Sequence, residues 1–421
     1  MRRGPRKRAV RVKILWVKTE LLHPLDKGGK IRTFHMLREL KRVHHITYLT
    51  LDDGQAAPDA VERAAEYCHD VVRIPFRVQP KRSSGFYAEL VGNLPSSLPY
   101  AVAKYRSRPM RQEISARVAG ADVDVLVCDF LFPSVNVPDG LRCSALLFQH
   151  NVEALIWKRH WELARDPVSR AYLRAQWRRM RAFEGGECHR YDHVVVVSPE
   201  DRDLVSREYG VRGVSDVPTG VDTAYFRPSG RYRRDPNSIV FTGSMDWIPN
   251  EDAVRFYVEQ ILPRVRQALP DATLVVVGRN PSPGLLALAA REPGVIVVGR
   301  VEDVRPYMER ASLYVVPLRI GGGTRLKIFE AMAMGLPVVS TRVGAEGLPV
   351  TDGQDIVLAD APAQFAGAVV QLLTDQARAR TLGEVAARTV RERAGWDRVA
   401  AEFAAICERV AVDTYEAAVR P

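Results

Sequence analysis

Short apolar runs alternate with a segment of helical periodicity along the first half of the chain. A continuous apolar run bounded by polar turns predicts a strand that is buried on both faces. Between the first two runs, apolar residues recur at helical spacing over residues 31–43. The alternation predicts a doubly wound, parallel α/β sheet. The runs cover residues 12–17, 46–51, 123–129, 144–150 and 193–198.

The same alternation restarts after residues 218–238, a segment rich in proline, glycine and charge that is typical of a linker. Helical patterns are found at 250–268 and 327–335, and the second ends in Gly335, a residue type that favours the left-handed conformation at a helix C-terminus. The chain therefore predicts two consecutive Rossmann-like units. The predicted strands of the second unit cover residues 238–243, 272–278, 294–299, 312–317 and 336–341.

The amino-acid composition excludes several classes of protein. The 421 residues are 46% hydrophobic and 26% charged, which is ordinary for a soluble globular protein of two domains. No apolar stretch approaches the roughly 20 residues of a membrane-spanning helix. The five cysteines are scattered without CxxC spacing. This argues against a zinc site or a disulfide framework and favours a reducing compartment.

Positive charge is concentrated in three places, and the formal net charge is +11. Residues 1–10 form a basic tail, and two long predicted helical stretches, 86–119 and 153–190, carry many arginines and lysines. The second stretch also carries three tryptophans. These segments are either solvated surfaces or a surface that binds an anionic membrane or a lipid-linked acceptor. No recognisable nucleic-acid-binding module accompanies the charge, so nucleic acid is not an expected partner.

A glycine-rich loop in the second half has the chemistry of an anion-binding site. The strand predicted at 312–317 feeds a triple glycine at 321–323, and a helix is expected to begin near Arg325. Glycines let backbone amides approach a ligand, and a helix N-terminus favours an anion. Lys327 adds a further charge, and Glu330 shares its helix face, where a carboxylate can accept hydrogen bonds from a ribose diol. These residues together indicate a nucleotide-diphosphate site.

Other motifs do not fit a catalytic role. Asp122 and Asp124 imitate the Asp-x-Asp of metal-dependent sugar transferases. They open a strand, however, whereas ligands of open α/β sheets bind beyond the carboxyl ends of the strands. We therefore expect a structural role for this pair and no metal site. The chain has no GxGxxG after its first strand, no GxSxG and no HExxH.

Residues 321–337 resemble the donor-site signature of the retaining GT-B glycosyltransferases of the family 4 type, the glycosyl transferases group 1. Segments 241–245, 299–303 and 335–341 follow the same family pattern. The resemblance implies the GT-B fold, in which two Rossmann-like domains face a cleft and a C-terminal helix crosses back to the N-terminal domain. The implied parts are an acceptor-binding domain at 1–220, a nucleotide-sugar-binding domain at 221–395 and the crossover helix at 396–421.

Three donor contacts that are usual in the family are replaced in this chain. The family commonly has Glu eight positions before Glu330, Arg just after the opening glycine of the donor domain, and Lys five residues later. Here these positions are Gly322, Ser244 and Pro249. The cations that follow the glycine loop are the expected substitutes for the lost charge, and the glycine amides are the expected substitute for the carboxylate.

Two positions in the first half point to the same chemistry. Gly28 and Gly29 follow the first predicted strand, where the resemblance implies a glycine loop facing the cleft and the diphosphate. A simple turn is the alternative. His150 directly follows another strand, a position suited to a ligand-binding residue. The resemblance implies a histidine that orients the donor sugar, and a structural histidine is the alternative.

These implications predict a hexosyltransferase-type glycosyltransferase that works without metal or cofactor and uses a nucleotide-diphosphate-sugar as co-substrate. The sugar passes with retention to an acceptor hydroxyl on a glycan, a lipid-linked glycan or a small molecule, in cell-envelope or exopolysaccharide synthesis. The expected location is the cytoplasm, peripherally at the inner face of the membrane. A non-catalytic binding protein and a sugar-nucleotide epimerase of the same fold are the alternatives. The expected catalytic residues are Arg325, Lys327 and His150, and the expected donor-binding residues are Gly28, Gly29, Gly243, Ser244, Val301, Gly321, Gly322, Gly323, Thr324 and Glu330.

Overall fold

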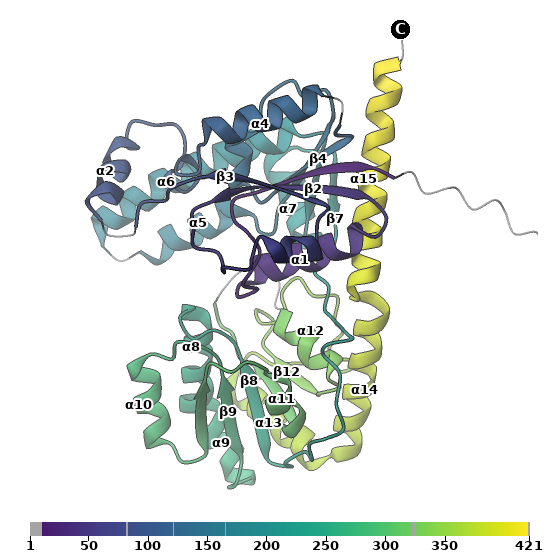
Figure 1. Cartoon of the computed structure of the whole chain (residues 1–421). Helices are drawn as coiled ribbons and strands as arrows, with labels where there is room; N and C mark the ends of the chain where they lie inside the picture. Colours follow the sequence, from purple (N-terminus) through teal and green to yellow (C-terminus); the bar gives the residue numbers. More distant parts are fainter. Residues whose placement is uncertain (1–10, 81–82, 121, 165, 321–325, 420–421) are drawn as a thin grey trace, which may run out of the picture. The chain divides into compact units, whose positions relative to one another are not determined.

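The chain forms two compact α/β units (Figure 1). The computed structural model describes residues 11–80, 83–120, 122–164, 166–320 and 326–419, so the basic tail at 1–10 lies outside the described residues. Unit 1 comprises the chain up to residue 218 together with residues from 397 onward, and unit 2 comprises residues 219–396. The sequence-based boundaries were placed at 220/221 and 395/396.

Unit 1 is built on a parallel sheet whose strand order is β3-β2-β1-β4-β5-β6-β7. The order reverses between β1 and β4, which are direct neighbours in the sheet. Buried apolar strands form its centre, as predicted, whereas the edge strands β3 and β7 are partly exposed and lack a continuous apolar run. The strands are β1 (Lys13–Lys18), β2 (His45–Asp52), β3 (Asp70–Pro75), β4 (Val125–Asp129), β5 (Ser144–Phe148), β6 (His193–Val196) and β7 (Val214–Asp216).

The helices of unit 1 correct two sequence-based expectations. The stretch 86–119 is three helices and the stretch 153–190 is two, because Ser107 and Asp166 each cap a new helix with their side chains just ahead of a proline. The helix expected at 31–43 begins earlier, at Gly28, so both glycines lie in its first turn. The helices are α1 (Gly28–Leu40), α2 (Ser84–Gly92), α3 (Tyr100–Ala103), α4 (Arg108–Ala119), α5 (Glu153–Leu163), α6 (Pro167–Arg190) and α7 (Pro199–Tyr209), with short 3-10 turns at Glu62–Glu66 and Phe132–Asn136.

Unit 2 has a second parallel sheet, with strand order β10-β9-β8-β11-β12-β13. Its order reverses between β8 and β11. The strands are β8 (Ser238–Thr242), β9 (Thr273–Val277), β10 (Val295–Gly299), β11 (Leu313–Val316), β12 (Val338–Ser340) and β13 (Val357–Leu358). The two sheets confirm the predicted pair of Rossmann-like units.

The helix predicted at 250–268 is interrupted by a π turn at Tyr257–Ile261, next to Pro263, which has no N–H for an intrahelical bond. Gly335 ends α12 with φ +67°, as its residue type predicted. The helices of unit 2 are α8 (Ile248–Phe256), α9 (Leu262–Ala268), α10 (Pro283–Arg291), α11 (Arg305–Arg310), α12 (Leu326–Ala333), α13 (Pro362–Thr374) and α14 (Gln376–Arg393).

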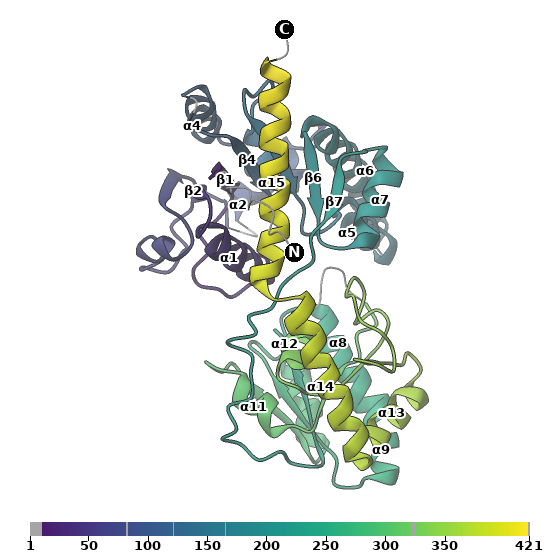
Figure 2. The same cartoon turned by 90° about the vertical axis from the view of Figure 1, so that its right-hand side faces the viewer.

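The last helix, α15 (Trp396–Val419), packs on unit 1, as Figure 2 shows. The ring of Phe403 lies 5.5 Å from that of Trp16 and 5.0 Å from that of Phe148, and all three rings are buried. Ser144 donates from its hydroxyl to the carbonyl of Val410 at 2.8 Å. These contacts confirm that the chain crosses back to its first unit.

The Asp122–Asp124 pair has the structural role expected of it. The Asp124 carboxylate accepts from the backbone N–H of Lys13 at 2.7 Å, and Asp122 forms an ion pair with the ammonium of Lys13 at 3.2 Å. Both acids therefore fix the start of β1, at the amino ends of the strands. The five cysteines are free and buried. Among the described helices, none carries an apolar stretch long enough to cross a bilayer.

Candidate functional site

In unit 2, one cationic side chain lies at the carboxyl edge of the sheet, where the strand order reverses. Lys327 is in the first turn of α12, and its Nζ donates to Asn250 Oδ1 at 2.7 Å. The same Nζ lies 4.2 Å from the centroid of the buried Phe241 ring. A Cβ on Gly243, the residue after β8, would lie 2.5 Å from this Nζ. The structure therefore brings together the predicted residues Lys327 and Gly243.

Ser244 extends this cluster through two residues that the sequence analysis did not single out. Asn250 donates from Nδ2 to the carbonyl of Ser244 at 2.8 Å, so its amide bridges Ser244 and Lys327. Arg279, just past the end of β9, donates from Nε to Ser244 Oγ at 2.8 Å. A polar residue directly after a buried strand was the available signal for Arg279. This cluster therefore includes Lys327 on α12 and Arg279 after β9, both at the carboxyl edge of unit 2.

Glu330 lies one turn after Lys327 on α12 and is half-buried. Burial raises the pKa of Glu330 to about 7, while the charge of Lys327 acts in the opposite direction. A carboxyl group in this state gains by accepting hydrogen bonds, because they favour its charged form. The site thus offers a carboxylate that a hydroxyl-bearing ligand would stabilise.

Val301, a further predicted donor residue of unit 2, lies farther from this cluster. Val301 lies beyond the carboxyl end of β10, on the far side of β9 from β8, and packs against the core of unit 2. The other predicted residues, Gly321, Gly322, Gly323, Thr324 and Arg325, lie outside the described residues, and their roles stay predictions.

Replacing Gly243 by alanine tests the cluster around Lys327. The new methyl group would overlap Lys327 Nζ and would lie 2.7 Å from the Asn250 side chain, so it must displace the ammonium. A displacement of about 1 Å from a productive position costs about a hundredfold in rate. We expect Gly243→Ala to lower donor turnover by about this factor. Because φ at Gly243 is +154°, an alanine there is also strained, so turnover is measured per folded molecule. The matched control is Gly353→Ala in the same unit, which also has a positive φ, +75°, but whose Cβ meets nothing within 4 Å. Equal turnover in the two variants would contradict this placement of Lys327.

In unit 1, a buried charge network lies at the corresponding point of order reversal. Asp129, the last residue of β4, accepts at Oδ2 from Lys18 Nζ at 2.8 Å, Trp16 Nε1 at 2.9 Å and Thr33 Oγ1 at 2.6 Å. Its Oδ1 lies 2.7 Å from His150 Nε2. Burial disfavours the charged carboxylate, but Lys18 and His150 outweigh that effect and hold the pKa of Asp129 well below its usual range.

His150 is buried and neutral. Burial lowers the pKa of His150 to about 3, against the opposing charge of Asp129. Since Nε2 faces the carboxylate of Asp129, we assign the ring proton to Nε2, which leaves Nδ1 as an acceptor. Among the described residues Nδ1 has no hydrogen-bond partner, and it lies 4.0 Å from where a Cβ on Gly29 would be. The structure therefore brings His150 to the N-terminus of α1.

The ring of Phe130 packs against both His150 and Lys18. Phe130 has φ +74°, a left-handed conformation that is uncommon for a bulky residue and costs about 1–2 kcal/mol. Its ring stacks on His150 at 3.9 Å between centroids and lies 4.4 Å from Lys18 Nζ. A Cβ on Gly29 would meet the Phe130 ring at 2.9 Å, so only glycine allows this approach. Gly28, at the first position of α1, is exposed.

The loop that carries His150 is fixed by a second buried carboxyl group. Glu184 on α6 accepts from the backbone N–H of Glu153 at 2.8 Å and of Ala154 at 2.9 Å, at the start of α5. Tyr209 donates its hydroxyl to the same carboxyl group at 2.8 Å. Burial raises the pKa of Glu184 to about 7, and burial together with Glu184 raises the pKa of Glu153 to about 8.

These two carboxyl groups make the stability of unit 1 depend on pH. Both pKa values lie above the ordinary Glu value of 4.5, so their contribution is complete below that pH and is lost as pH rises toward 8. We expect Glu153→Gln to remove much of this loss and to stabilise unit 1 by ~2 kcal/mol at pH 8. Thermal unfolding measured from pH 4.5 to pH 8 tests this prediction. The control is the exposed Glu162→Gln on the same helix, and parallel pH profiles in wild type and Glu153→Gln would refute the assignment.

No three His, Cys, Asp or Glu side chains gather into a metal-binding group in the part of the chain that the structure describes.

Comparison with known proteins covers both units. A family model described as "Glycosyltransferase Family 4" matches residues 27–225, and one described as "Glycosyl transferases group 1" matches residues 236–375. A GDP-mannose-dependent alpha-(1-6)-phosphatidylinositol monomannoside mannosyltransferase of Mycobacterium tuberculosis is 25% identical over 77% of this chain and 94% of its own length. A Klebsiella pneumoniae protein of unknown activity in the cps region is 20% identical over 85% of this chain and 90% of its own.

Solved structures share the fold. A sucrose-phosphate synthase from Thermosynechococcus elongatus has a TM-score of 0.69 at 19% identity, over 95% of this chain and 99% of its own. The Anabaena protein HepE, in complex with UDP and glucose, has a TM-score of 0.63 at 14% identity, over 94% of this chain and 99% of its own. At these identities the likeness is one of fold.

Proposed function

Since the chain belongs to the GT-B glycosyltransferases of the family 4 type, we propose that it transfers a hexose from a nucleotide-diphosphate-sugar to an acceptor hydroxyl with retention at the anomeric carbon. The observation that carries the proposal is the cluster of Lys327, Asn250 and Arg279 around Gly243 and Ser244. It lies at the point where the strand order reverses, which is where open α/β sheets bind ligands.

The leaving diphosphate is the group that most needs stabilisation in such a transfer, because negative charge develops on it. Lys327 is held by Asn250 at the N-terminus of α12, where the helix dipole also favours an anion. Arg279 brings a guanidinium to Ser244, the position where the family commonly has an arginine. We assign to these two cations, with Arg325, the role of holding the diphosphate without a metal ion.

Glu330 is proposed to bind the ribose of the nucleotide. Its half-buried carboxyl group has a pKa raised to about 7, so two ribose hydroxyl donors would stabilise its charged form. The glycine loop at 321–323 and Thr324 are proposed to hold the diphosphate through backbone amides. Val301 is proposed to contact the base through its backbone.

His150, in unit 1, is proposed to orient the donor sugar. The neutral His150 presents Nδ1 as an acceptor, suited to a sugar hydroxyl, and Asp129 fixes its orientation from the other side. Gly28 and Gly29 place the first amides of α1 beside it. Unpaired amides at a helix N-terminus favour a negatively charged ligand group.

The acceptor is proposed to be a glycan of cell-envelope or exopolysaccharide synthesis, either free or lipid-linked. Two relatives support this class: the mannosyltransferase is named for a phosphatidylinositol mannoside, and the Klebsiella protein for the cps region. We accordingly place the enzyme in the cytoplasm, at the inner face of the membrane.

A nucleotide-release assay over UDP-, GDP-, ADP- and dTDP-sugars tests the proposal. We expect slow hydrolysis of one donor, faster release with an acceptor, and NMR spectra of the product that show the anomeric configuration of the donor. Inversion would refute retention. Conversion of the sugar without a transferred product would indicate an epimerase, and no turnover with intact nucleotide binding would indicate a binding protein.

A further inference from the structure

Helix α2 is an apolar helix without a buried residue. Its sequence SGFYAELVG contains a single charged residue, Glu89, which accepts from the Tyr100 hydroxyl at 3.0 Å. Tyr87, Val91 and Leu94 are 53%, 64% and 53% exposed. Tyr87 and Val91 are four residues apart on α2 and share one face, and Leu94 follows in the turn just after the helix; these three residues are called the α2 stripe. Contiguous apolar surface of this kind marks an interaction site.

The turn between α5 and α6 exposes further apolar side chains at the same end of unit 1 (Figure 1). Leu163 ends α5 and is 70% exposed, and Val168, in the first turn of α6, is 77% exposed. Arg179 on α6 donates to the carbonyls of Asn93 and Leu94, just after α2, at 3.1 and 2.5 Å. These bonds hold the C-terminal end of α2 against the middle of α6.

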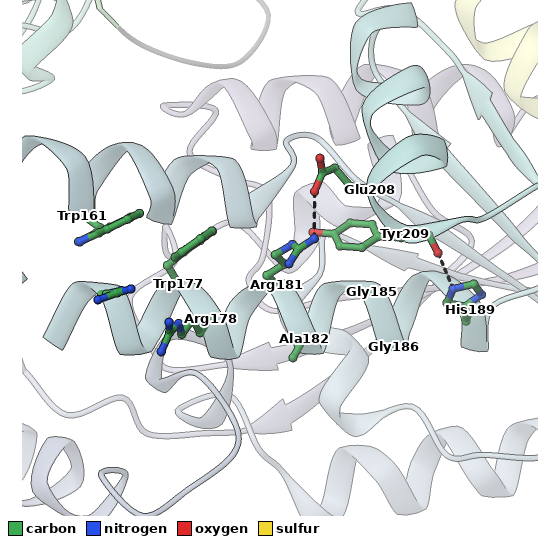
Figure 3. Close-up of a pocket in the computed structure, with 11 residues that line it drawn as sticks. Trp161, Trp177, Arg178, Arg181, Ala182, Gly185, Gly186, His189, Glu208 and Tyr209 are labelled. Atoms are coloured by element: carbon green, nitrogen blue, oxygen red, sulfur yellow. Dashed lines mark hydrogen bonds and ion pairs between the residues drawn. The ribbon is translucent and has the colours of Figure 1, made fainter. Parts of the chain in front are cut away.

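Beside this apolar end lies a basic groove of about 680 Å³ along α6 (Figure 3). Trp161 from α5 and Trp177 from α6 stack with their centroids 5.0 Å apart and their planes within 10°. The guanidinium of Arg174 covers Trp161 at 5.6 Å. Arg178 and Arg181 follow Arg174 at positions i+4 and i+7, so all three arginines share one face of α6.

Within the described residues, the acidic groups near this face pair with other partners than Arg174 and Arg178. Glu208 pairs with Arg181 at 3.2 Å, and Glu162 lies 3.9 Å from Lys158 on α5. Asp166 caps the N-terminus of α6 through the N–H of Ser169. The positive charges of Arg174 and Arg178 are therefore not balanced by these acidic groups, and they lie beside the apolar residues.

We propose that the α2–α6 face, made of the exposed apolar residues of α2 and of the α5–α6 turn with Arg174 and Arg178, docks on an anionic phospholipid bilayer. The apolar side chains enter the boundary of the acyl chains, and the arginines contact lipid phosphates. Tryptophan at the junction of apolar and charged surface suits the membrane interface. A soluble polyanion would match the arginines but would leave the apolar stripe and turn without a partner. This docking rests on the proposed function in one respect: it would bring the enzyme to an acceptor at the membrane.

Vesicle flotation with the full-length protein tests the docking. The probes are vesicles of phosphatidylcholine alone and of phosphatidylcholine with one third phosphatidylglycerol, at low ionic strength. We expect binding to the anionic vesicles only. Leu163→Ser with Val168→Ser, and separately Arg174→Glu with Arg178→Glu, should each weaken binding about tenfold or more. The matched controls are Leu286→Ser on α10 and Arg391→Glu on α14, at exposed positions of unit 2.

Two results would overturn the docking. One is no binding of wild type to anionic vesicles. The other is an unchanged affinity of the Leu163 and Val168 variant combined with release of wild type by a soluble acidic polysaccharide, which would identify a polyanion site. Donor hydrolysis is measured in solution in the same variants. Retained hydrolysis with lost flotation separates the two proposals, and flotation without any hydrolysis would refute the proposed function alone.

Discussion

Lys327→Ala is expected to lower the release of nucleotide from the donor by about 10²–10³-fold, the usual effect of removing one group that stabilises a leaving anion. The ammonium is held by Asn250 and lies against Phe241, so it is preorganised rather than mobile. It is also the only lysine after residue 158 in the sequence, and arginine supplies the other basic side chains of unit 2.

Lys327→Arg tests whether the positive charge at this position is sufficient or whether the compact shape of the ammonium is also needed. A planar guanidinium does not fit the position of the compact ammonium beside Gly243, so we expect it to recover only part of the rate. The control is Arg391→Ala, an exposed cation on α14 of the same unit. Donor turnover within threefold of wild type in Lys327→Ala would exclude this residue from the reaction.

The largest effect on stability is expected from Asp129→Ala. Removing this carboxylate leaves the ammonium of Lys18, which is 2% exposed, buried without its partner. Breaking a buried ion pair from one side costs about 3–5 kcal/mol. We expect a fall of this size in the free energy of unfolding of unit 1, with faster hydrogen exchange in β1 and β4.

A second substitution tests whether the unpaired ammonium of Lys18 causes the loss of stability in Asp129→Ala. Lys18→Met removes the unpaired charge, so Lys18→Met combined with Asp129→Ala should be more stable than Asp129→Ala alone. Asp139→Ala is the control, because its carboxylate pairs with Arg190 at an exposed position. If the double variant is no more stable than Asp129→Ala, the unpaired ammonium is not the source of the loss.

The apolar runs predicted the strands at the centre of each sheet because those strands are buried on both faces. β3 and β7 were not predicted, since their burial is partial and depends on neighbours that lie far away in the sequence. The breaks within the two long basic stretches could have been predicted, because Ser107-Arg108-Pro109 and Asp166-Pro167 carry a capping residue ahead of proline.

The site was predictable in part. Lys327 and Glu330 follow from the glycine-rich loop and from helical spacing, and His150 from its place after a strand. Lys18 and Asp129 also end buried strands, so their positions carried the same sequence signal as that of His150. Their pairing could not be predicted, because it depends on β1 and β4 becoming neighbours. Asn250 gave no such signal, since its role arises from the approach of α8 to α12.

The proposed function requires the carboxyl edge of unit 2 to bind a nucleoside diphosphate. Hydrogen–deuterium exchange of the full-length protein, with and without UDP, GDP, ADP and dTDP, tests it most directly because the readout locates the ligand. We expect one diphosphate to slow exchange in residues 241–251 and 326–331, and Lys327→Ala to remove this protection. Protection confined to unit 1, or none in these two segments with any of the four, would contradict it.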